Sequence, residues 1–114
     1  MTIDENMTIL LLFAAALLEA GGDALIRSGL HSSTIMARTS FFLVGAIVLF
    51  SYGYVVNAPP WDFGSLLGVY VVFFFIHAQL ISWLVFRQRP TVAVLLGGAF
   101  ILIGGFIISF NSRS

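Results

Sequence analysis

The sequence has no cysteine, no lysine and few charged residues of any kind. Without cysteine, a disulfide framework, a thiolate metal site and a cysteine nucleophile are excluded. Five arginines balance five acids, so the net charge is zero and no basic patch for nucleic acid is indicated. Charged residues make up 9% of the 114 residues, against about 25% in soluble domains. Because 60% of the chain is hydrophobic, we infer an integral membrane protein with little room for another domain.

Four apolar segments of about 20 residues follow one another, and each is long enough to cross a bilayer as a helix. They lack the alternation of a membrane β-barrel, so the sequence predicts an all-α, multi-pass membrane protein. Short connections containing Pro59, Pro60 and Pro90 favour antiparallel neighbours in a bundle. We expect a single domain over residues 1–114, with transmembrane helices at 7–26, 37–56, 64–86 and 92–110.

The arginines are distributed unevenly along the chain. Arg27 and Arg38 flank the first connection, and Arg87 and Arg89 lie in the third, whereas the opposite side of the membrane receives only Arg113. By the positive-inside rule, we expect the first and third connections on the cytoplasmic side of the membrane and both termini outside.

Two carboxylates interrupt the first apolar segment. Glu19 and Asp23 are four residues apart and share a helix face, which Arg27 continues one turn later. An acid in the middle of a membrane segment is costly and marks a functional site by default. Glu19 and Asp23 are therefore candidates for a site that exchanges a proton for a cation. For Asp23, a simple ion pair with Arg27 is an equally good interpretation.

The third segment carries His77 and Tyr70, which are seven residues apart and share a face. They are candidates for a proton relay or for a wall of the binding cavity. Interhelical hydrogen bonding without a functional role is the alternative for His77. A metal site is not indicated, because no spacing of ligands supports one, and no cofactor is expected.

Gly97 and Gly104, two helical turns apart, form a smooth strip on the fourth segment. Such strips allow another helix to approach closely. Since four helices enclose little interior, we expect this face to hold a homodimer that completes a cavity around Glu19.

With this order of segments and polar residues, the chain resembles the small multidrug resistance family of the drug/metabolite transporter superfamily. The stretch L-L-E-A-G-G-D-A-L (17–25) is similar to the family's first helix, whose membrane glutamate corresponds to Glu19. The stretches Y-G-Y-V-V-N-A-P-P-W-D-F-G (52–64) and L-G-V-Y-V-V (67–72) resemble the YnfA-like branch, and F-R-Q-R (86–89) resembles the third loop.

The resemblance implies an antiparallel homodimer in contact at Gly97 and Gly104, with two copies of Glu19 that bind substrate or protons alternately. Family substrates are lipophilic cations. Three features differ from the drug exporters. Leu66 and Leu67 occupy the stretch where those proteins carry a tryptophan, and Asp23 is an additional acid. The arginine bias is also larger than an antiparallel dimer of one chain would require.

The sequence thus predicts a proton-coupled exporter of small organic cations rather than an enzyme. The alternative is a non-transporting membrane subunit or assembly partner whose buried acids pair with basic groups of another protein. A transporter needs Glu19 open to water, whereas a structural acid is permanently paired.

Overall fold

The protein consists of four long helices joined by short connections, and no strand occurs in the described part of the chain. The computed structural model describes residues 4–112, apart from the side chains of residues 5, 111 and 112, so Arg113 and the termini lie outside the described residues. All four helices are long and apolar enough to cross a membrane, which confirms the all-α prediction. They are α1 (Glu5–Leu30), α2 (Ile35–Val56), α3 (Phe63–Leu84) and α4 (Val92–Ser112).

Polar side chains fix where the helices begin. The Asp4 carboxylate accepts a hydrogen bond from the backbone N–H of Met7 at 2.8 Å, so α1 starts two residues earlier than its apolar run. Thr34 caps α2. The Thr91 hydroxyl accepts from the N–H of Val94 at 3.2 Å, directly after Pro90, and starts α4.

Six of the eight helix ends differ from the predicted bounds, five of them by one or two residues and the end of α1 by four. α1 ends at Leu30, four residues beyond its predicted end at residue 26, so Arg27 belongs to the helix. α3 stops two residues before residue 86, where the backbone N–H of Gln88 turns back to donate to Ser82 O at 2.9 Å. Arg87, just before it, adopts a left-handed conformation with φ 58°, which reverses the chain.

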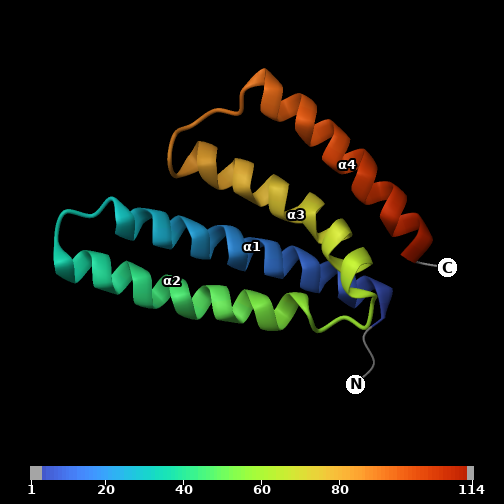
Figure 1. Ribbon diagram of the computed structural model, residues 1–114, viewed down its shortest axis with the longest axis horizontal. Coiled ribbons are helices and arrows are strands. Elements are labelled where there is room, and N and C mark those ends of the chain that lie inside the picture. The colour runs from blue at the N-terminus through green and yellow to red at the C-terminus, as the bar shows by residue number, and fades with distance from the viewer. Residues whose placement is uncertain (1–3, 113–114) are drawn as a thin grey trace.

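The helices lie in a row rather than around a closed centre (Figure 1). α1 packs between α2 and α3, and α4 packs on the outer side of α3. The molecule is a slab of 52 × 40 × 19 Å. As a consequence, this chain alone does not enclose α1 on all sides.

Glycines allow the close contact between α1 and α2. A Cβ added at Gly22 would lie 2.6 Å from the Leu49 side chain, and one at Gly45 would lie 2.9 Å from Ile26. In a membrane, where lipid is as apolar as leucine, such close packing rather than the hydrophobic effect holds helices together.

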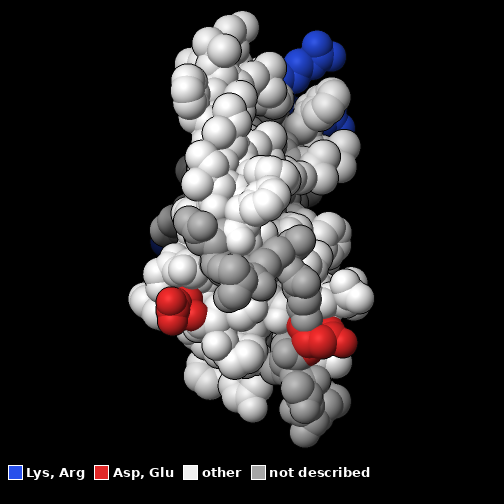
Figure 2. Space-filling view, turned by 90° about the vertical axis from the view of Figure 1, so that its right-hand side faces the viewer, with Lys and Arg blue, Asp and Glu red and all other residues white. Residues whose placement is uncertain are grey.

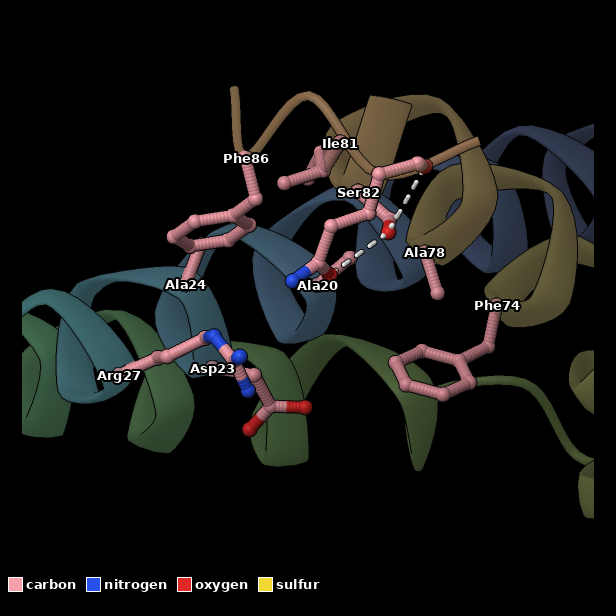
Figure 3. A pocket seen from close by; sticks show the side chains of 10 residues that line it. Ala20, Asp23, Ala24, Arg27, Phe74, Ala78, Ile81, Ser82 and Phe86 are labelled. Carbon is pink, nitrogen blue, oxygen red and sulfur yellow. Dashed lines mark hydrogen bonds between the residues drawn. The ribbon is translucent and has the colours of Figure 1, made fainter. Parts of the chain in front are cut away.

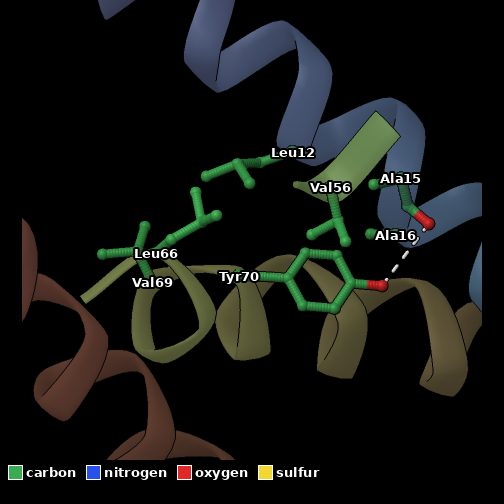
Figure 4. Packing of buried hydrophobic residues seen from close by; sticks show 7 residues of the cluster. All are labelled: Leu12, Ala15, Ala16, Val56, Leu66, Val69 and Tyr70. Atoms are coloured by element: carbon green, nitrogen blue, oxygen red, sulfur yellow. Dashed lines mark hydrogen bonds between the residues drawn. The ribbon is translucent and has the colours of Figure 1, made fainter. Parts of the chain in front are cut away.

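The best-buried cluster joins α1 to α3 near the start of α3 (Figure 4). It combines small residues of α1 with larger ones of α3 and the last residue of α2: Leu12, Ala15, Ala16, Val56, Leu66, Val69 and Tyr70. This cluster fixes the register of α3 against α1 and thereby the position of Tyr70.

The two ends of the slab differ in charge. Of the described residues, Arg27, Arg38, Arg87 and Arg89 belong to the end that carries the α1–α2 and α3–α4 connections. Figure 2 looks onto the opposite end, where acidic side chains lie at the surface and basic ones show only at the margin. This asymmetry agrees with one preferred orientation in the membrane.

A labelling experiment tests that orientation, since the chain is free of cysteine. Ser33→Cys, in the α1–α2 connection, is expected to react with an impermeant maleimide only after the membrane is permeabilised. Ala58→Cys, in the α2–α3 connection, is expected to react in intact spheroplasts. Equal labelling of both variants from both sides would instead indicate dual insertion.

Candidate functional site

Glu19 lies half-buried in the middle of α1, one turn after the buried Ala15 and Ala16. The hydroxyl of Tyr70, from α3, donates a hydrogen bond to Glu19 Oε1 at 2.6 Å. A short bond between a hydroxyl and a carboxylate is among the stronger kinds in proteins. Two of the four predicted site residues are therefore in direct contact, and Tyr70 sets the orientation of the Glu19 side chain.

Aromatic side chains from two other helix positions border this pair. The rings of Tyr52 (α2) and Tyr70 lie 5.6 Å apart, and Phe74 stacks on Tyr70 at 6.3 Å. Tyr52 was not among the predicted site residues. Its signal in the sequence is a tyrosine inside an apolar helix, which becomes informative only once α2 and α3 are known to flank α1.

The contribution of the Tyr70 hydroxyl to ligand binding can be tested by removing it. Tyr70→Phe keeps the ring in its packed position but removes the donor that stabilises an ionised Glu19. We expect cation binding at constant pH to weaken by roughly tenfold, the effect of one hydrogen bond to a charged group. Isothermal calorimetry in detergent measures it. Tyr54→Phe, on the exposed side of α2, is the matched control and should bind like the parent. Unchanged binding in Tyr70→Phe would show that Glu19 does not depend on this bond.

Asp23 lies one turn beyond Glu19 and faces a cavity between α1 and α3 (Figure 3). Within the described residues no ion pair joins it to Arg27. The Arg27 guanidinium lies instead over the ring of Phe86, 5.3 Å from its centre, in a cation–π contact. The Asp23 carboxylate and the Arg27 guanidinium thus reach the same cavity as separate charges.

The cavity has a volume of about 270 Å³. Its walls combine small residues of both helices with two phenyl rings and four polar side chains: Ala20, Asp23, Ala24, Arg27, Phe74, Ala78, Ile81, Ser82, Phe86 and Gln88. Glu19 does not line it, so the cavity and the Glu19–Tyr70 pair are neighbouring but distinct features.

His77 is buried but lies apart from the Glu19–Tyr70 hydrogen bond. Its Nδ1 is 2.8 Å from the backbone oxygen of Phe73 in the same helix. Because that oxygen can only accept, Nδ1 carries the proton. The ring also contacts the edge of Phe13 at 4.5 Å. No group of three potential ligands suited to a metal ion occurs in the described part of the chain.

The glycines of α4 divide into two pairs. Gly98 and Gly105 are buried against α3. Around Gly97 and Gly104, in contrast, there is open space, with no atom within 4 Å of an added Cβ. The predicted dimer strip is therefore the strip that this chain leaves uncovered.

Comparison with known proteins identifies the family of this chain. A family profile described as "Uncharacterised BCR, YnfA/UPF0060 family" matches residues 6–114. The chain belongs to the YnfA/UPF0060 family. It is also 32% identical over 108 residues to UPF0060 membrane protein YfjF of Bacillus subtilis (strain 168), covering 94% of this chain and 96% of that protein. No solved structure matches the chain. The YnfA-like part of the resemblance is thereby confirmed, and this family lies in the drug/metabolite transporter superfamily.

Proposed function

We propose that this YnfA/UPF0060 protein is a transporter of the bacterial inner membrane that exchanges protons for small organic cations at Glu19. One observation carries the proposal: a carboxylate in the middle of a membrane helix is oriented by a neutral tyrosine hydroxyl. A neutral partner leaves the negative charge available to a proton or to a cation in turn. The small multidrug resistance resemblance, with its membrane glutamate at the position of Glu19, supports the same chemistry.

The alternative, a subunit whose acids pair with basic groups of another protein, requires a permanent partner for Glu19. Among the described residues, the charged side chain nearest in sequence is the acid Asp23, and the hydrogen-bond partner of Glu19 is Tyr70. Within residues 4–112, the hydrogen-bond partner of Glu19 is thus a neutral hydroxyl and not a basic group, which favours the transporter.

We further propose that the functional unit is a homodimer. The helices form an open row, and Glu19 stays only partly buried within it. A second copy would enclose the site and shield the charge from lipid. The uncovered Gly97–Gly104 strip of α4 offers a surface for close helix contact.

The most direct solution test is the release of protons by cations. In weakly buffered detergent solution, adding a quaternary ammonium compound to the purified protein should release up to one proton per Glu19. The released protons lower the pH of the solution. A pH-indicator dye measures the change. Binding of the same compounds without any proton release would contradict a shared site.

A further inference from the structure

We propose that the cavity between α1 and α3 is a second ligand site, separate from Glu19, for a small molecule that carries both a cationic and an anionic group. The proposal does not depend on transport or on Glu19. It rests on the two opposite, mutually unpaired charges of Asp23 and Arg27 at one edge of the cavity (Figure 3).

The charges determine which ligand is favoured. A simple cation would be attracted by Asp23 but repelled by the guanidinium of Arg27 nearby, and a simple anion would meet the reverse. A molecule with both charges neutralises both side chains at once and brings no net charge into the membrane boundary. Arg27 is held over the Phe86 ring, which keeps its donors available for a carboxylate.

The size of the cavity restricts the ligand further. Ala20, Ala24 and Ala78 create the space where α1 and α3 face each other. A volume of about 270 Å³ lies just below the range of about 300–1,000 Å³ for drug-sized ligands. The ligand class is therefore small zwitterions rather than planar aromatic drugs.

Polar residues line the cavity on the side of the α3–α4 connection. The left-handed residue Arg87 turns the chain so that Gln88 folds back onto Ser82, to which its N–H donates at 2.9 Å. Both side chains line the cavity and add neutral donors and acceptors beside the two charges. Such groups orient a ligand without favouring either sign of charge.

Asp23 and Arg27 lie about one helical turn apart on α1, so both of their side chains can be reached by one small ligand. A short ω-amino acid such as 4-aminobutyrate carries one group of each charge and is small enough for a cavity of about 270 Å³. Butylamine and butyrate are matched controls, because each lacks one of its two charged groups.

Calorimetry on the full-length protein in detergent tests the proposal with these three probes. We expect 4-aminobutyrate to bind at least about tenfold more tightly than butylamine or butyrate, the effect of one additional charge-assisted contact. Arg27→Gln should remove the advantage over butylamine, and Asp23→Asn should remove the advantage over butyrate. Equal binding of all three probes to the parent, or an unchanged preference in both variants, would overturn the proposal.

Three further variants separate this site from Glu19 and from general misfolding. Glu19→Gln should bind 4-aminobutyrate like the parent even if it no longer releases protons, so the two proposals fail independently. Ala24→Leu fills the cavity without touching either charge and should abolish binding, whereas Ala99→Leu, exposed on α4, should not. Retained binding in Ala24→Leu would place the ligand elsewhere and overturn the assignment.

Discussion

Cation-driven proton release is expected to fall to the baseline in Glu19→Gln, with the four helices intact. The substitution preserves the shape of the side chain, and the Tyr70 hydroxyl can still donate to the amide oxygen in place of Oε1. It removes the group that holds a proton or a cation in turn. Because a neutral amide is also cheaper to place in a membrane helix than a carboxylate, stability should not decrease.

The control for this experiment is another acid converted to its amide. Asp62 lies at the start of α3, is exposed and makes no side-chain cap hydrogen bond. Asp62→Asn should therefore release protons like the parent. If Glu19→Gln also behaved like the parent, the exchanging group would have to be another residue, and Glu19 would not be the central site.

The second large effect concerns the glycines of α4, whose two pairs should respond in opposite ways. A Cβ at Gly98 would lie 2.5 Å from the Phe75 ring, and one at Gly105 would meet the side chain of Val72. Gly98→Leu and Gly105→Leu should therefore separate α4 from α3. Overpacking of this kind destabilises by about 1–3 kcal/mol or more, so these variants should unfold at clearly lower temperature.

Gly97→Leu and Gly104→Leu should instead leave the monomer as stable as the parent, because nothing within 4 Å opposes the new side chain. They should block close approach of a second copy and shift the detergent-solubilised protein toward monomer. Light scattering coupled to gel filtration measures the mass. Dimers of unchanged mass in both variants would exclude this strip as the contact.

Much of the fold could be predicted from the sequence because membrane helices are specified by length and composition alone. The row arrangement could not, since it depends on which small residue meets which large one. Gly22 against Leu49 and Gly45 against Ile26 are pairings between helices, and no pattern within one helix reveals them.

The site shows the same division. Glu19 could be predicted because a charge inside an apolar helix is costly, and Tyr70 because it shares a polar face of α3 with His77. The cavity beside Asp23 could not, because Ala20, Ala24 and Ala78 look like ordinary apolar positions until α1 and α3 are placed together. The placement of Gln88 on its wall depends on a left-handed residue that no glycine marks.

Flux through proteoliposomes tests the central proposal most directly. Purified protein is reconstituted in liposomes with and without a pH gradient, and the movement of a panel of small quaternary ammonium and guanidinium compounds is measured. We predict that at least one compound moves against its own gradient when protons flow the opposite way, and that Glu19→Gln abolishes this movement. Flux no greater than in empty liposomes, or flux that ignores the pH gradient, would contradict proton-coupled exchange at Glu19.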